Sequence, residues 1–380
     1  MKRYYKLIIF MIMCVIIIYF SPMLKMSITQ PNYFEQDFEE AEVLKIMDEE
    51  LEEDPVLAGR YMGTQRIKVK ILSGKYEDKI FEIVNPLSSS HNVLAKEGMI
   101  LITCVREKNG EVIPWVYNYK RDKTLYILLA AFFLLIIIFG GIKGINSIIS
   151  LIFTGIMIVF VMLPLIFQGK NPIWVAILTT SITTIVTFIL IGGLSYKSLA
   201  AILGTIAGVT IAGLISYTAG EVVHLSGITM EKGQQLLYVA KDYRIQIRGL
   251  MFTAILIASL GAIMDVAMSI SSATFELYKT DPKRSKGELF KSAMNIGKDI
   301  MGTMSNTLIL AFVGSSLNTI MLIWGFQMKH KQFMNIPSIG TEVIQGLAGS
   351  IGIILTVPIT AAMAVALLKK EKMVSKNISR

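Results

Sequence analysis

Uninterrupted apolar runs of about 20 residues recur along this chain, and they constrain its fold more than any other feature. Each run is long enough to cross a hydrocarbon core of about 30 Å as a helix, whereas a soluble domain would alternate apolar and polar faces. The 380 residues are 53% hydrophobic and 17% charged, which lies outside the usual composition of soluble domains. The sequence therefore predicts a mainly α-helical, polytopic membrane bundle.

The apolar runs predict about eight transmembrane helices. The first run follows three basic residues and has no small-x-small cleavage site after it, so we expect residues 1–26 to form an uncleaved anchor. The other seven runs predict a membrane core at residues 124–368. The expected spans are 7–24, 124–139, 145–167, 173–194, 198–219, 249–271, 303–326 and 343–368.

Two local patterns refine the expected core. The glycine-rich segment 140–144 is so short that spans 124–139 and 145–167 should form a tight helical hairpin. Ser285 and Glu288 have the spacing of a capping box and precede an amphipathic stretch, which predicts an interfacial helix near 285–301.

Residues 27–123 have a different character and predict a separate, β-rich domain. Strand-like alternation occurs at 66–72, 79–84, 99–105 and 111–119, and Asn109-Gly110 between the last two is a strong hairpin signal. Four such segments fit a small barrel of OB or SH3-like type. The acidic stretch 35–54 carries apolar residues at roughly helical spacing, so we expect a short helix or linker there.

Basic residues set the expected orientation, because cytoplasmic loops are enriched in lysine and arginine. Residues 275–301 and the tail 369–380 carry the two clearest basic clusters, so both termini should be cytoplasmic and residues 27–123 extracytoplasmic. Basic residues at 120–123 oppose this assignment. The net charge of +9 is concentrated beside apolar runs, where it would face lipid headgroups rather than a nucleic acid.

Asp265 is the most informative single residue, because it lies about 24 Å along the span that begins at Gly249. A carboxylate in mid-membrane costs about 2.5–3.5 kcal/mol on insertion scales and normally faces the bundle interior or a water-filled cavity. Ser269, Ser272 and Gly261 lie on nearly the same helix face. We expect either a site for a proton or cation, or a structural hydrogen-bond anchor.

A second polar group opens the next span, with Asp299, Thr303 and Asn306 at its start and Asn318 further along. Amides in a bilayer need partners, and the Asp265 face is the natural partner for Thr303 or Asn306 because both helices meet the same inner loop. Ordinary interhelical hydrogen bonding is the alternative interpretation.

The remaining polar and small residues favour packing over a functional role. The last span contains Glu342, Gln345, several glycines and Pro358, which fit either close packing with a kink or a broken helix that exposes carbonyls to an ion. Gly204 and Gly208 form a GxxxG pattern typical of helix contact. The threonines at 179–187 can bond their own helix backbone or line a pore.

Sequence signatures of enzymes are missing from the spans: there is no HExxH, GxSxG, P-loop or paired aspartates. We therefore expect no catalytic residues, no cofactor and no metal site. The expected partners are the lipid bilayer, a proton, cation or small solute, and a partner membrane protein or a second copy of the chain.

Four stretches resemble one family of membrane proteins. GAIMDVAMSISSA (261–273) and GKDIMGTMSNTLILAF (297–312) are similar to the core of the YibE/F-like family, as are GLAGSIGIILTVPIT (346–360) and QLLYVAKDYRIQIRGLMF (235–252). The resemblance implies a bacterial cytoplasmic-membrane protein with an external N-terminal domain and a multi-helix core. Asp265 and Asn306 match the aspartate and asparagine of the family stretches, and the resemblance assigns them no role.

Two functions fit these observations. The first is a permease-like transporter in which Asp265, supported by Ser269, Thr303 and Asn306, binds a proton or cation. The second is a scaffold that does not transport, whose external domain binds a protein or envelope component while the helices anchor it.

Overall fold

A computed structural model describes residues 36–378, apart from 109–110, 229–232 and 243–244. The chain divides into two compact units, one within residues 27–135 and one within 136–380. The expected anchor at residues 1–26 lies outside the described residues and stays a prediction.

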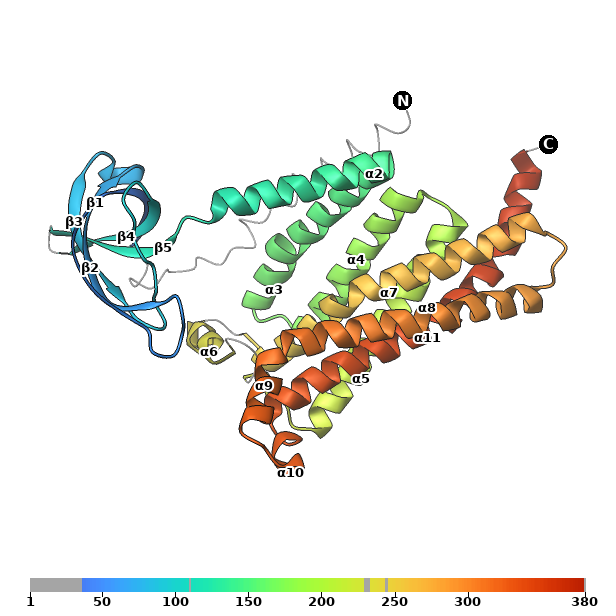
Figure 1. The fold of residues 1–380 in the computed structure, drawn as a ribbon. Helices are drawn as coiled ribbons and strands as arrows, with labels where there is room; N and C mark the ends of the chain where they lie inside the picture. The colour runs from blue at the N-terminus through green and yellow to red at the C-terminus, as the bar shows by residue number, and fades with distance from the viewer. Residues whose placement is uncertain (1–35, 109–110, 229–232, 243–244, 379–380) are drawn as a thin grey trace. The chain divides into compact units, whose positions relative to one another are not determined.

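The first unit is a five-stranded antiparallel sheet that curls into a half-barrel (Figure 1). Its spatial order is β3-β2-β1-β4-β5. Alternate residues of β2, namely Ile67, Val69 and Ile71, are fully buried in a core of its own. The strands are β1 (Asp37–Glu53), β2 (Tyr61–Ile71), β3 (Ile80–Leu87), β4 (Ile100–Lys108) and β5 (Glu111–Tyr119).

All four expected strands are present, and the hairpin prediction is confirmed by the pairing of Lys108 at the end of β4 with Glu111 at the start of β5. The prediction of a helix or linker at 35–54 is wrong, because this segment is β1. Register shifts at Val43/Lys45 and Ile46/Asp48 add extra residues to β1. Each bulge changes the phase of the two-residue alternation, so the apolar residues recur at a spacing that resembles a helix.

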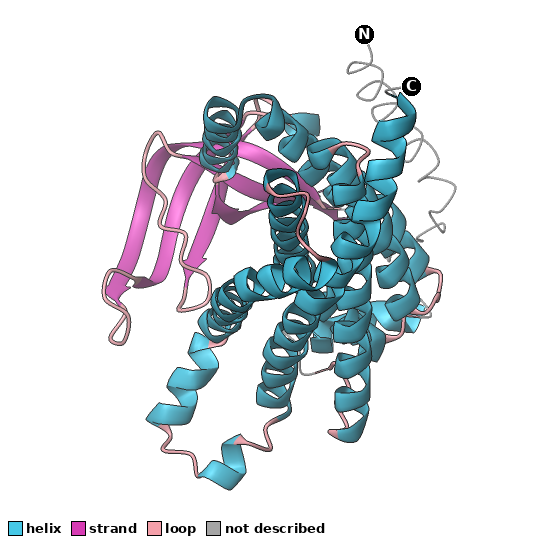
Figure 2. Cartoon of the chain, turned by 90° about the vertical axis from the view of Figure 1, so that its right-hand side faces the viewer, coloured by secondary structure: helices cyan, strands magenta, loops and turns pink. Residues whose placement is uncertain are grey.

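The second unit consists of long helices packed side by side, and all the strands belong to the first unit (Figure 2). Among the described residues, five helical segments are long and apolar enough to cross a membrane, or up to six if one bent pair is a single span. The expectation of about eight spans stays a prediction. The helices are α2 (Asp122–Met157), the π-helix η3 (Ile158–Met162), α3 (Leu163–Phe167), α4 (Pro172–Gly192), α5 (Tyr196–Val222), α6 (Gly233–Asp242), α7 (Ile247–Thr280), α8 (Lys286–Ser315), α9 (Leu317–Gly325), α10 (His330–Phe333) and α11 (Pro337–Ile378).

The chain reverses direction within α2, as the glycine-rich segment predicts. Gly141 has a non-helical backbone with φ of 53°. A β-carbon on Gly144 would collide with the carbonyl oxygen of Ile136, although these residues would be about 12 Å apart in a straight helix. The tight turn between the two apolar segments is therefore confirmed.

The prediction for residues 303–326 needs correction. The capping box of Ser285 and Glu288 is present and starts α8, a single helix that contains the expected helix near 285–301 and continues to Ser315. The interfacial position of its first part stays a prediction. The expected span at 303–326 is instead broken at Ser316, where α8 and α9 meet at a bend of 62°. Gly314, Ser315 and Ser316 have low helix propensity, which favours a break at this point.

Helices α5, α7 and α11 form the centre of the second unit, and small residues allow them to approach closely. β-Carbons on Gly204 and Gly208 of α5 would collide with the hydroxyls of Thr360 and Thr356 on α11. A β-carbon on Gly352 of α11 would lie 2.8 Å from Ala212 Cβ. The GxxxG prediction of helix contact is confirmed, and so is close packing of α11, which continues through Pro358 without a break.

Replacement of Gly204 by leucine should therefore destabilise the fold by separating α5 from α11, at a cost of about 1–3 kcal/mol or more. The apparent melting temperature of the purified protein in detergent, followed by size-exclusion chromatography after heating, should fall by several degrees. Gly302→Leu is the matched control, because no heavy atom lies within 4 Å of a β-carbon at Gly302. Equal melting temperatures for the two variants would contradict this packing.

Candidate functional site

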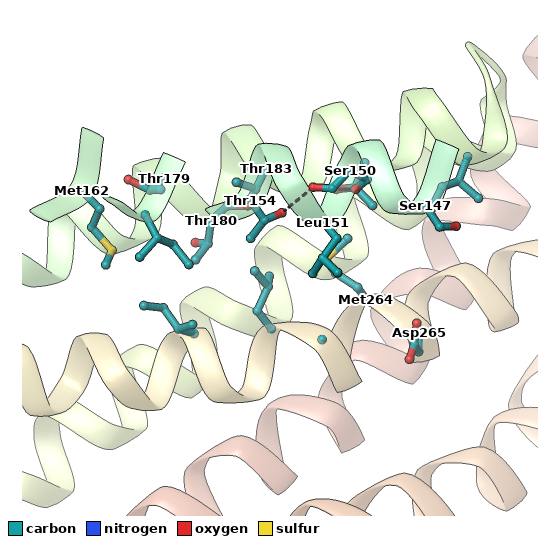
Figure 3. A pocket seen from close by; sticks show the side chains of 16 residues that line it. Ser147, Ser150, Leu151, Thr154, Met162, Thr179, Thr180, Thr183, Met264 and Asp265 are labelled. Carbon is teal, nitrogen blue, oxygen red and sulfur yellow. Dashed lines mark hydrogen bonds between the residues drawn. The ribbon is translucent and has the colours of Figure 1, made fainter. Parts of the chain in front are cut away.

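Asp265 lines a cavity of about 390 Å³ between α2, η3, α4 and α7. It lies on α7, across the cavity from hydroxyl-bearing side chains of α2 and α4 (Figure 3). The apolar part of the lining includes Ile158 and Met162, the first and last residues of the π-helix η3. Such short π-helical segments often occur at functional sites.

Serine and threonine hydroxyls form the wall that faces Asp265. They come from one face of α2 and one face of α4, because their spacing of three or four residues repeats with the helix turn. The hydroxyl-bearing residues that line the cavity are Ser147, Ser150, Thr154, Thr179, Thr180, Thr183 and Thr187.

Several of these hydroxyls donate their hydrogen to the backbone of their own helix. Thr180 donates to the Ala176 carbonyl at 2.8 Å, Thr183 donates to the Thr180 carbonyl at 2.9 Å, and Thr154 donates to the Ser150 carbonyl at 3.0 Å. A hydroxyl whose hydrogen is used in this way can offer only its oxygen lone pairs to the cavity. These hydroxyls of α2 and α4 therefore present acceptors to the cavity, which suits a cation or a hydrogen-bond donor.

Hydrogen bonds between α2 and α4 hold this wall together. The hydroxyls of Ser150 and Thr187 lie 2.6 Å apart, and both side chains are buried. Four residues earlier on α2, the Asn146 amide donates to the Leu190 carbonyl at 3.0 Å. Asn171 caps the start of α4 by accepting from the Ile173 N–H, and Pro172 occupies its first position. The Ser150–Thr187 and Asn146–Leu190 hydrogen bonds fix the height and rotation of α4 relative to α2.

Asp265 has no hydrogen-bond or ion-pair partner among the described residues. Gly261, one turn earlier on α7, also lines the cavity, and no heavy atom lies within 4 Å of a β-carbon placed there. Asp265 is exposed, so its carboxyl group is open at the mouth of the cavity. A carboxylate that faces lone-pair oxygens without a counter-charge leaves room for a bound cation or proton.

The expected contact between the Asp265 face and α8 is not formed, and this prediction is corrected. Asp299, Thr303 and Asn306 are exposed on α8, and none of them lines the Asp265 cavity. Thr303 donates to carbonyls of its own helix. The side of α7 that packs toward α8 carries Ile270, about 140° around the helix from Asp265.

The other predicted site residues are dispersed. Ser269 is exposed and Ser272 is half-buried on α7, and neither lines the cavity. Asn318 is exposed on α9, Gln345 is half-buried on α11, and Glu342 lines a different cavity. No group of three or more His, Cys, Asp or Glu side chains suited to a metal ion occurs in the part of the chain that the structure describes.

Sequence reasoning missed the α2 contribution to the cavity. Ser147, Ser150 and Thr154 are spaced by three and four residues, so they share one face of a helix. Together with the threonines of α4, this spacing could have predicted that a polar face of α2 lies inside the bundle.

A protein-family model described as YibE/F-like protein matches residues 128–370. The match includes every residue that lines the Asp265 cavity. No curated protein and no solved structure gives a significant match.

The cavity should contain water, and this can be measured with cysteine reactivity. After replacement of Cys14 and Cys104 by serine, Thr154→Cys should react with a hydrophilic methanethiosulfonate in intact membranes, because water supports the thiolate. Ile152→Cys is the control on the same helix: its side chain is exposed but does not line the cavity, so it should face lipid and react at least about tenfold more slowly. Similar rates at both positions would contradict a hydrated cavity.

Proposed function

The chain belongs to the YibE/F-like family, and within this family we propose that it is a permease-like transporter that binds a proton or cation at Asp265. One observation carries the proposal: an unpartnered carboxyl group faces a wall of hydroxyl oxygens across a cavity between helices. Ionisable groups inside membrane bundles commonly mark ion or proton pathways.

Carboxyl and hydroxyl oxygens share the lining with apolar side chains, and these oxygens support a small, hard cation or a proton as the ligand. Carboxylate and hydroxyl oxygens replace part of a cation's hydration shell, and the acceptor wall described above offers lone pairs rather than competing hydrogens. Thr154, Thr180 and Thr183 are the residues that we assign to this role, in place of the Thr303 and Asn306 expected from the sequence.

We further propose the topology that the basic clusters indicate. Both termini are cytoplasmic, the half-barrel is extracytoplasmic, and the bundle lies in the bacterial cytoplasmic membrane with about eight spans. In this orientation Asp265 lies in the inner half of α7, and the cavity extends from it along α4 toward the membrane centre.

Asp265→Asn tests the proposal, because it removes the charge and the titratable proton while nearly preserving the shape of the side chain. In proteoliposomes, flux of protons, sodium or potassium should fall at least about tenfold, which corresponds to about 1.4 kcal/mol. Asp299→Asn is the matched control, because Asp299 is exposed on α8 away from the cavity, and its flux should equal that of the wild type. Equal flux in wild type and Asp265→Asn would remove the carboxyl group from the mechanism.

The scaffold hypothesis is favoured by one observation, the separate hydrophobic core of the half-barrel, which would allow this unit to bind a partner on its own. Deletion of residues 27–123 distinguishes the two functions. A transporter core should keep flux that depends on Asp265, whereas a scaffold should show no flux in any form and should lose its partners in cross-linking. Absence of flux in the full chain as well as in the deletion variant, together with loss of the cross-linked partners on deletion, would favour the scaffold.

A further inference from the structure

A second cavity, of about 430 Å³, lies between α8, α9, α10 and α11. It shares no residue with the Asp265 cavity. Its lining is almost entirely apolar and includes Phe312 of α8, Ile323 of α9 and Leu347 of α11. The volume falls within the range of pockets that bind small molecules, about 300–1,000 Å³.

Two residues that line this cavity each have a buried side-chain oxygen with no hydrogen-bond partner among the described residues: Oε2 of Glu342 and Oγ of Ser316. A buried polar atom without a partner is unfavourable, and more so if it is charged. Glu342 is the one charged side chain among the described residues that line this cavity. Both unpartnered atoms therefore indicate a missing hydrogen-bond donor.

The break in the α8–α9 span forms part of this cavity. Ser316 is the residue at the break, and the 62° bend turns α9 away from the line of α8. Glu342 lies about 8 Å from the start of α11. One turn further along α11, Gly346 leaves space, because the nearest atom to a β-carbon placed there is Phe312 Cδ2 at 3.8 Å. Glu342 therefore places the polar end of the cavity near the first turns of α11, and the apolar part of the cavity lies along Gly346 and Leu347.

We propose that this cavity binds a small hydrophobic amine, whose ammonium group bonds to Glu342 and Ser316 and whose apolar body fills the space lined by α8, α9 and α11. An ammonium group has three donors and no acceptor, so it matches a carboxylate and a hydroxyl oxygen. A lipid tail would leave both oxygens unpartnered, and an anion would be repelled by Glu342. Water is a poor occupant, because an ordered water needs two to four polar partners and an apolar cavity stays dry.

A photoreactive aryl-diazirine benzylamine, with the neutral benzyl alcohol of the same skeleton as its control, tests the proposal on the purified full chain. Mass spectrometry of the irradiated protein should find the amine attached within residues 309–347. Glu342→Gln should raise the amine concentration needed for half-maximal labelling at least about tenfold, because it removes the ion pair. Labelling by the alcohol should hardly change.

Two further variants keep the test decisive. Gly346→Leu retains Glu342 but fills the apolar space, so it should abolish labelling by both probes while the protein elutes normally in size-exclusion chromatography. Asp265→Asn should leave labelling unchanged, which separates this site from the proposed transport site. Equal labelling of the wild type by amine and alcohol, or unchanged amine labelling in Glu342→Gln, would overturn the proposal and leave a lipid-filled apolar cavity.

Discussion

The close approach of α5 to α11 is the constraint on which the helical unit depends. In a membrane the hydrophobic effect does not drive helices together, so they associate through tight van der Waals packing, which small residues permit. Gly204 and Gly208 have no side chain, so Thr360 and Thr356 of α11 can pack directly against the α5 backbone. The remaining long helices must then pack around this centre. Both cavities lie where these outer helices meet the central ones.

Asp265 and Glu342 illustrate how this arrangement separates polar groups from the packed centre. Asp265 lies on the side of α7 that faces α2 and α4, away from the buried Ile263 and Ile270. Glu342 lies on the side of α11 that faces the α8–α9 break. Each carboxyl group belongs to a residue that lines a cavity, and neither has an ion-pair partner among the described residues. Their surroundings differ, because hydroxyl oxygens form part of the first lining whereas the second lining is almost entirely apolar, and this difference supports different ligands.

Local sequence rules succeeded where short-range physics decides the structure. The capping box at Ser285, the reversal at Gly141, the β4–β5 hairpin and the strands of the half-barrel each depend on residues close together in the chain. They failed at β1, where two bulges altered the alternation of side chains, and at Ser316, where the span was predicted to continue although Gly314, Ser315 and Ser316 interrupt the apolar run. In both cases the apolar residues were identified correctly, but the bulges in β1 and the bend at Ser316 were not predicted.

The sequence by itself determined that the chain has long apolar helices, a separate β-rich unit and a carboxyl group in an apolar span, because composition and periodicity reflect solvent preference directly. It did not determine which helix Asp265 faces. Rotation of a helix by one residue turns a side chain by about 100°, so the neighbours of Asp265 depend on how α5 and α11 direct the packing of α7. Only the tertiary structure placed Asp265 at one end of a cavity that Thr154, Thr180 and Thr183 also line. It also left a side-chain oxygen of Glu342 and one of Ser316 without a hydrogen-bond partner among the described residues.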